Sequence, residues 1–145
     1  MSRDQNHHFT GSCHCGAIRV SLAFTRPAAE TQVRSCQCGF CIRQGSATVS
    51  DPDGHAVWEI EAARYVPYQF ATGTATSILC AKCGVYAGAM LTDADGAWSI
   101  ANTRGLAMTE FSGRTGEHMD YEQKTPAQRI ARRKRRWTPT EVRMR

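Results

Sequence analysis

The sequence predicts an all-β fold of several short twisted β-sheets with one short helix near the C-terminus. Three observations support this fold class. Apolar and polar residues alternate with a period of two in several segments, turn residues separate these segments, and all seven cysteines fall into three tight clusters. Short strands bury little apolar area, so a fold made of them needs further cross-links, and the cysteine clusters are the candidates for these links.

The length and composition favour a single compact domain. A chain of 145 residues with 41% hydrophobic residues can bury a core of ordinary size. We expect a flexible N-terminus over residues 1–10, a central domain over 11–112 and a C-terminal extension over 113–145. The first residues lack the apolar stretch of a signal peptide, and no segment is long and apolar enough for a membrane helix. We therefore expect a cytoplasmic protein that does not associate with membranes.

The predicted strands begin at residues 17–24, where the apolar residues alternate with polar or small ones. A second extended segment runs through Val33, and the proline at position 67 indicates an edge strand. Further short strands are indicated at 47–49, 58–60, 64–70 and 74–79. The large aromatic residues in strand-like segments are interpreted as core, with a place in a substrate wall as the alternative: Trp58, Tyr86 and Trp98.

The last part of the chain predicts a hairpin followed by the helix. Residues 85–91 and 97–101 flank a turn sequence, as in a β-hairpin. Thr125 and Gln128 resemble a capping box with Pro126 at the first helical position, so a helix is expected from there to about Trp137. Thr138-Pro139 is expected to end it.

The net charge of +5 comes largely from this helix, because six of the eight residues from 129 to 136 are Arg or Lys. Such a run can bind nucleic acid or form the solvated face of a packed helix. Ile130 and Trp137 lie seven positions apart and provide one apolar face for packing. No nucleic-acid-binding motif or interleaving of aromatic and basic residues accompanies the run, so we favour a packed helix and do not expect a nucleic-acid partner.

The cysteine clusters are the most informative feature. They read Cys13-His14-Cys15, Cys36-Gln37-Cys38-Gly39-Phe40-Cys41 and Cys80-Ala81-Lys82-Cys83. Cysteines one or two residues apart cannot usefully bridge each other, but they can direct two sulfurs at one metal ion. A tetrahedral zinc site takes four ligands, so seven cysteines divide into one closed site of four and one site of three with a vacant position. We predict two zinc ions per chain, with the sheets arranged around them.

The four-cysteine site is predicted from two pairs, Cys13 with Cys15 and Cys80 with Cys83. Each pair is followed by a glycine, which suits a knuckle in which the backbone turns tightly and its N–H groups point at sulfur. Such a site would clamp two distant segments together and stabilise the fold. The alternative is four buried apolar cysteines. His14 lies between two ligands, where its ring is expected to point away from the metal.

The three-cysteine site is predicted from Cys36, Cys38 and Cys41, which share one short loop. Three ligands leave the fourth position of zinc open for water or substrate, as in a catalytic site. Two alternatives remain: a second structural site closed by a further ligand, for which His55 and His118 are candidates, and a redox trio.

A site of three thiolates is negatively charged once it holds zinc, and a bound thiolate adds to that charge. Nearby cations would offset it. Arg34, Arg43 and Lys82 are close to the clusters in sequence and are the expected candidates.

The order Cys-x-Cys, Cys-x-Cys-x-x-Cys, Cys-x-x-Cys-Gly resembles the glutathione-dependent formaldehyde-activating enzyme family, which shares its domain with centromere protein V. The match covers about residues 11–105. The resemblance implies an all-β zinc fold and a reaction that joins formaldehyde to glutathione to give S-hydroxymethylglutathione, classed as a carbon–sulfur lyase. It implies a structural zinc on the four-cysteine set, Cys13, Cys15, Cys80 and Cys83, and a catalytic zinc on Cys36, Cys38 and Cys41.

We therefore expect a zinc-dependent enzyme that adds a thiol, glutathione or a smaller one, to formaldehyde or another small aldehyde, or that catalyses the reverse reaction. The alternative is a non-catalytic module in which both zinc ions are structural and the surface binds a partner.

Overall fold

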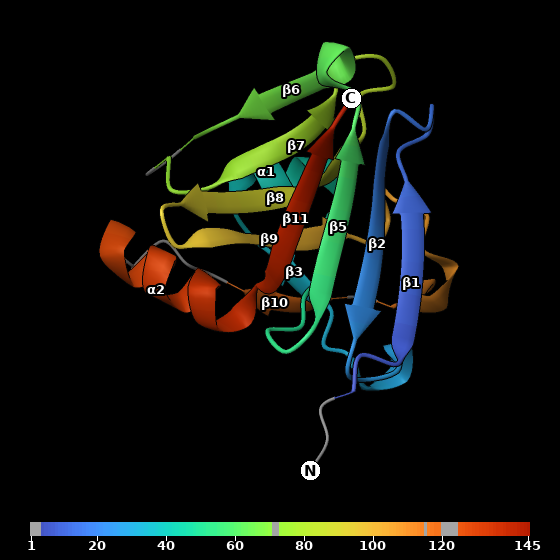
Figure 1. The fold of residues 1–145 in the computed structure, drawn as a ribbon, viewed down its shortest axis with the longest axis vertical. Helices are drawn as coiled ribbons and strands as arrows, with labels where there is room; N and C mark the ends of the chain where they lie inside the picture. Colours follow the sequence, from blue (N-terminus) through green and yellow to red (C-terminus); the bar gives the residue numbers. More distant parts are fainter. Residues whose placement is uncertain (1–3, 71–72, 115, 120–124) are drawn as a thin grey trace.

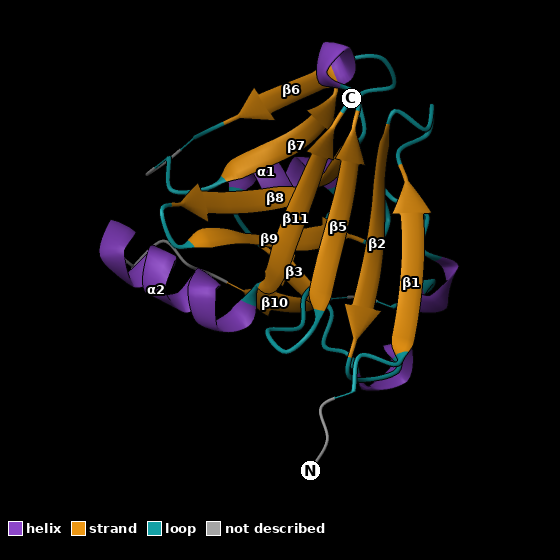
Figure 2. Ribbon diagram, viewed as in Figure 1, coloured by secondary structure: helices purple, strands orange, loops and turns teal. Residues whose placement is uncertain are grey.

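The computed structural model describes residues 4–70, 73–114, 116–119 and 125–145, and most of its regular structure is β-strand (Figures 1 and 2). Two layers of strands cross each other, and helix α2 lies on the left of the view, beside one of the layers (Figure 1). The predicted all-β fold class with a short C-terminal helix is confirmed.

The first layer has β2 and β5 at its centre. Strand β2 pairs antiparallel with both β1 and β5, and β5 pairs parallel with β11. The strands of this layer are β1 (His7–Ser12), β2 (Ile18–Phe24), β5 (His55–Ile60) and β11 (Thr138–Met144).

The second layer is built around the hairpin of β8 and β9, which was predicted from the sequence. On one side β8 pairs with β7, and β7 pairs with β6; on the other side β9 pairs with β4, followed by β3 and β10. Its strands are β3 (Arg34–Cys36), β4 (Thr48–Val49), β6 (Tyr65–Tyr68), β7 (Thr76–Cys80), β8 (Tyr86–Asp93), β9 (Gly96–Asn102) and β10 (Glu117–Met119). Within the described residues β6 pairs only with β7, as Pro67 predicts for an edge strand.

Strand β11 joins the two layers. Its first residues, Thr138 and Pro139, pair antiparallel with Ser99 and Trp98 of β9, and the rest of the strand continues beside β5. The Thr138 side chain also accepts a hydrogen bond from the Asp51 backbone N–H at 2.9 Å. The strand is therefore shared by both layers.

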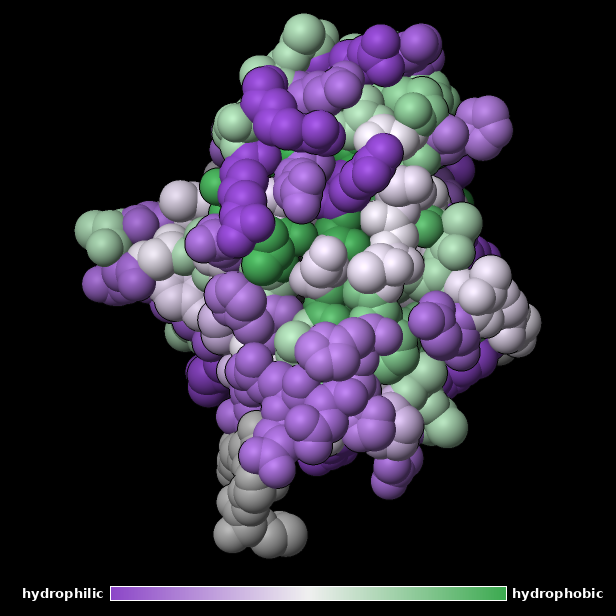
Figure 3. All heavy atoms as spheres, turned by 45° about the vertical axis from the view of Figure 1, so that its right-hand side comes forward, coloured by the Kyte–Doolittle hydropathy of each residue, from purple (hydrophilic) through white to green (hydrophobic). Residues whose placement is uncertain are grey.

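The core lies between the layers. The alternating apolar residues of β2 all point into it, and Trp58 of β5 is fully buried with its indole N–H donating to Ser99 Oγ at 2.9 Å. Gly88 of β8 allows close packing within and between the layers. A Cβ there would lie 2.2 Å from the Ile100 carbonyl oxygen of the neighbouring strand and 3.0 Å from the Trp58 ring of the other layer. On the face of the molecule nearest β1, hydrophilic side chains surround an apolar centre (Figure 3).

Helix α2 (Pro126–Arg136) begins as predicted. The Thr125 backbone N–H donates to Gln128 Oε1, and the Gln128 backbone N–H donates to Thr125 Oγ1, which completes the capping box. A second helix, α1 (Gly39–Gln44), was not predicted. In the described part of the chain, 3₁₀ turns lie at Ala28–Glu30, Ala62–Arg64 and Thr109–Phe111.

Helix α2 docks on the hairpin through its apolar face. Trp137 is buried with Ala89 and Leu91 of β8, and Ile130 packs against the same cluster. Lys134 forms ion pairs with Asp93 at 2.6 Å and with Asp95 at 3.0 Å. The prediction that Ile130 and Trp137 anchor this helix is confirmed. Among the described residues, no helix is long and apolar enough to cross a membrane.

The structure differs from the sequence-based expectation at the N-terminus. The flexible N-terminus was predicted to extend to residue 10, but His7–Ser12 form β1, whose backbone pairs with β2 along its whole length. Residues 113–145 were predicted to be a C-terminal extension with a basic helix. The structure adds strand β11 to this segment, and because β11 lies between β5 and β9 it is part of the main fold.

Candidate metal centres and the adjoining cavity

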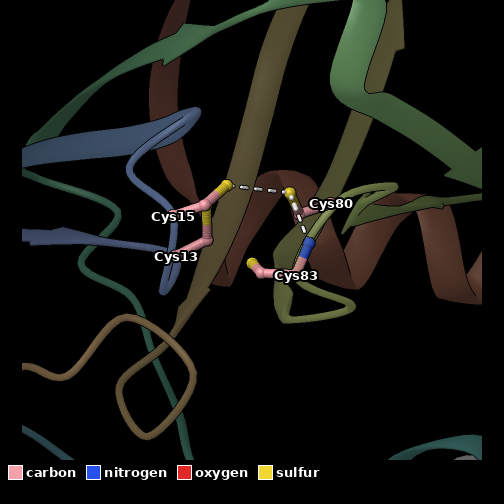
Figure 4. Close-up of side chains that lie close together, drawn as sticks. All are labelled: Cys13, Cys15, Cys80 and Cys83. Atoms are coloured by element: carbon pink, nitrogen blue, oxygen red, sulfur yellow. Dashed lines mark hydrogen bonds between the residues drawn. The ribbon is translucent and has the colours of Figure 1, made fainter.

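The first cluster brings together the four cysteines that the sequence analysis paired (Figure 4). Cys13 and Cys15 lie on the connection between β1 and β2, while Cys80 ends β7 and Cys83 follows it. The four sulfur atoms lie within 4.8 Å of one another. Sγ of Cys15 is 3.8 Å from Sγ of Cys13 and 3.5 Å from Sγ of Cys80.

These distances fit a tetrahedral metal ion. Zinc binds cysteine sulfur at about 2.3 Å, so two sulfurs on one tetrahedral zinc lie about 3.8 Å apart. The two knuckles have the geometry that the glycines predicted, because Gly16 and Gly84 have positive φ angles of 84° and 78°. Backbone N–H groups point at sulfur in both: Ile18 donates to Cys13 at 3.3 Å, and Cys83 donates to Cys80 at 3.4 Å.

The electrostatics of the four sulfurs also suit a cation. Burial raises the pKa of the Cys13 thiol to about 11. Burial acts on Cys83 in the same direction, but the backbone N–H groups of Cys15 and Val85 lower its pKa to about 6. Cys83 therefore favours the thiolate, whereas Cys13 favours the thiol. The sulfurs of this cluster become thiolates together only when a cation offsets their negative charge.

The second cluster is the triad of Cys36, Cys38 and Cys41, whose sulfur atoms also lie within 4.8 Å of one another. Cys36 ends β3, Cys38 is the N-cap of α1, and Cys41 lies in the first turn of that helix. The Cys38 sulfur accepts a hydrogen bond from the Cys41 backbone N–H at 3.4 Å. The helix therefore turns the chain back on itself and brings three closely spaced sulfurs to one point.

The electrostatics of the triad favour the thiolate form of Cys36. The Cys41 thiol donates to Cys36, which lowers the pKa of Cys36 to about 6, and the positive charge of Arg129 contributes to this decrease. The same hydrogen bond and burial raise the pKa of Cys41. Three thiolates this close need a cation between them, so the donor set fits a metal ion.

The triad lies in the wall of a cavity of about 600 Å³. None of the four cysteines of the other cluster lines this cavity. Four aromatic rings form the wall near the triad, and Phe40, which belongs to the triad loop, contacts the other three. The aromatic wall consists of Phe40, Tyr68, Phe70 and Tyr86.

Tyr86 is buried and lines the cavity beside the triad. Its ring packs edge-on against Phe40 with centroids 5.1 Å apart, and 4% of the residue is exposed. Burial raises the pKa of its phenol well above the ordinary value, and the negative charge of the triad sulfurs raises it further. The phenol is therefore protonated at neutral pH. Tyr86 was interpreted as a core residue with a place in a substrate wall as the alternative, and the structure shows it both buried and lining the cavity.

Five arginines line the cavity. Arg34 and Arg43 were predicted as cations near the triad, and both lie there. The remaining three, Arg129, Arg132 and Arg133, come from α2 and were not assigned to this site. Lys82 is exposed on the turn of the four-cysteine cluster and does not line the cavity, so its predicted role is wrong.

The histidines considered as additional ligands do not join either cluster within the part of the chain that the structure describes. His14 is exposed, as expected for a residue whose ring points away from the metal. His118 is exposed on β10, and His55 is exposed on β5.

The comparisons with known proteins support the fold. A scan of the sequence against known protein families finds no match. Among solved structures, the chain is similar to a Rhodobacter sphaeroides protein from a structural genomics programme, with 27% sequence identity and a TM-score of 0.51. The similarity covers 76% of this chain and 99% of that one. The bacterial protein therefore corresponds to most of the domain described here.

Proposed function

We propose that the protein is a zinc-dependent enzyme of the carbon–sulfur lyase type. It adds a thiol, glutathione or a smaller one, to formaldehyde or another small aldehyde, or catalyses the reverse. In this proposal Cys13, Cys15, Cys80 and Cys83 hold a structural zinc, and the triad holds a catalytic one. The observation that carries the proposal is the difference in setting: the triad lines a cavity and the four-cysteine cluster does not line it.

The reaction is a simple addition. A carbon–sulfur bond forms between the thiol sulfur and the carbonyl carbon, the π bond of the carbonyl breaks, and the thiol proton ends on the new hydroxyl oxygen. Cys36, Cys38 and Cys41 would hold the zinc ion, which would supply Lewis-acid chemistry that favours the thiolate form of a thiol.

The residues of the chain would position the reactants and provide the proton. Tyr86 is the candidate donor, because its phenol is protonated at neutral pH and lines the same cavity as the triad. Arg129, whose charge acts on Cys36, would offset negative charge next to the thiolates. The aromatic wall would limit the access of water to this side of the cavity.

The proposal is tested by measuring thiol binding and turnover separately. Cobalt substituted at the triad gives a visible spectrum that responds to thiolate ligation, and this spectrum is titrated with glutathione, cysteine and buffer alone. Exchange NMR then measures hydroxymethyl-thiol formation against the uncatalysed rate. Cys41→Ser is the control, since it removes one triad sulfur and leaves the four-cysteine cluster intact.

We expect a thiol-dependent spectral change and an accelerated reaction in the wild type, both lost in Cys41→Ser. If no thiol alters the spectrum and the reaction proceeds at the uncatalysed rate, the non-catalytic zinc module becomes the better description.

A further inference from the structure

We propose that the thiol substrate is an aromatic compound that carries an anionic group, and that its ring and its anion are recognised by two different walls of the cavity. This inference rests on the proposed function, because it assigns a substrate class to the same site. It selects among small thiols and disfavours the polar tripeptide glutathione.

The first wall is aromatic and directly adjoins the triad. The Phe40 ring centroid lies 5.0 Å from that of Phe70 and 5.4 Å from that of Tyr68, and the planes of Tyr68 and Phe70 are stacked with an interplanar angle of 28°. Tyr68 is 43% exposed and Phe70 is 37% exposed, so these rings are available to a ligand. Rings arranged in this way favour a flat aromatic ligand, which gains offset or edge contacts beyond simple apolar burial.

The second wall is positively charged and is built mainly by α2. Arg129, Arg132 and Arg133 line the cavity from this helix, and no described residue that lines it has a carboxylate. These arginines also have interactions within the chain, and Arg133 donates to Thr74 Oγ1. A guanidinium has five N–H donors, so it can keep such a contact and still bind an anion.

The positions of the two walls explain why one molecule would use both. The triad cysteines line the same cavity as Phe40 and Arg129, so both walls border the site where the thiol would bind. A cavity of about 600 Å³ has the size of a typical small-molecule site, which is lined mostly by apolar side chains with a few fixed polar groups. Glutathione has little apolar surface to place against the aromatic wall.

The test measures dissociation constants by calorimetry on the zinc-loaded protein. 4-(Mercaptomethyl)benzoate has all three proposed features, and each other probe lacks one. Benzyl mercaptan lacks the anion, 6-mercaptohexanoate lacks the ring, and phenylacetate lacks the thiol. Glutathione is the competing substrate. We expect the complete probe to bind at least about tenfold more tightly than benzyl mercaptan, 6-mercaptohexanoate and glutathione.

Two variants assign the effect to the two walls. Arg132→Gln should weaken binding of both carboxylate aryl probes about fivefold and leave benzyl mercaptan unchanged. Tyr68→Ala should weaken the aryl probes and leave 6-mercaptohexanoate unchanged. Arg135→Gln is the matched control, because Arg135 is on the same helix but is exposed and does not line the cavity; it should change nothing.

The outcomes separate this inference from the proposed function. Phenylacetate cannot react as a thiol, so its Arg132-dependent binding supports the substrate class even if no thiol addition is accelerated. If glutathione binds as tightly as the complete probe, or if Arg132→Gln and Arg135→Gln have the same effect, the inference is overturned, whether or not the protein accelerates thiol addition.

Discussion

Cys41 and Cys83 are both half-buried cysteines, but they hold different parts of the molecule together. Cys83 belongs to a cluster that joins the β1–β2 connection to the end of β7, whereas Cys41 shares one loop with the other two sulfurs of its triad. Loss of a ligand should therefore have a global effect in one cluster and a local effect in the other.

We predict that Cys83→Ser unfolds or aggregates, because it opens a link between segments 65 residues apart. Cys41→Ser should remain folded, bind less zinc and lose activity. Thermal unfolding and zinc content measured on both variants check this. Equal damage to stability in both variants would refute the division into a structural and a catalytic site.

A second prediction concerns the phenol of Tyr86. Tyr86→Phe keeps the ring that packs on Phe40 and removes the proton donor. We expect zinc content and melting temperature to stay near wild type while the rate of thiol addition falls about 100-fold, as is typical for loss of a general acid. A variant with a wild-type rate would show that another group supplies the proton.

The site residues that sequence could predict are those whose chemistry depends on short spacing. The division of all seven cysteines into two groups agrees with the structure, because the cysteines of each segment are two or three positions apart, as is typical of ligands of one ion. Arg129, Arg132 and Arg133 could not be assigned to the triad, since they are about 90 residues away along the chain and meet it only through packing of α2. The prediction for Lys82 was wrong for the converse reason. Lys82 is next to the four-cysteine cluster in the sequence, and this does not place its side chain at the triad.

Among the elements, α2 combines packing with cavity lining. Its C-cap Trp137 is buried with Ala89 and Leu91 at the edge of the same cavity that the arginines of α2 line. The apolar contact is thus what keeps the charged wall in place.

We predict that Trp137→Ala destabilises the protein by about 3 kcal/mol, because a large side chain that is 6% exposed leaves a cavity when truncated. It should also weaken binding of anionic aryl thiols. Arg135→Ala, a change on the exposed side of the same helix, should stay within about 0.5 kcal/mol of wild type. Denaturant unfolding checks both values, and equal stability of the two variants would contradict the packing of the helix.

Two elements escaped sequence-based prediction for identifiable reasons. Helix α1 has only six residues and begins at a cysteine N-cap. The spacing of the cysteines in this segment predicted a metal-binding loop, so the helix was not predicted. Strand β11 begins with Thr138-Pro139, which is typical of a helix stop, and contains Glu141 and Arg143. It becomes a strand because β5 and β9 offer partners on either side, which is a tertiary effect that local propensity does not contain.

At the scale of the whole molecule, the two cysteine clusters should differ in how readily they would lose a bound ion. The first cluster offers four ligands to one ion, whereas the triad offers three and faces a cavity. We predict two zinc ions in the reduced protein, of which a mild chelator removes one while the fold survives. Metal analysis and circular dichroism during chelation check this, and a single tightly held ion in fully reduced protein would contradict an intact triad site.

The shared strand β11 has a consequence for how fast the chain reaches this structure. Its contacts join residues 87 positions apart, and such non-local pairing is slow because a long loop must close before any contact is gained. Zinc bound early by the four-cysteine cluster would close a loop of 65 residues first and shorten the remaining search. Refolding followed by stopped-flow fluorescence should therefore be markedly slower when zinc is withheld, so the metal would act as a folding nucleus before it acts as a structural support.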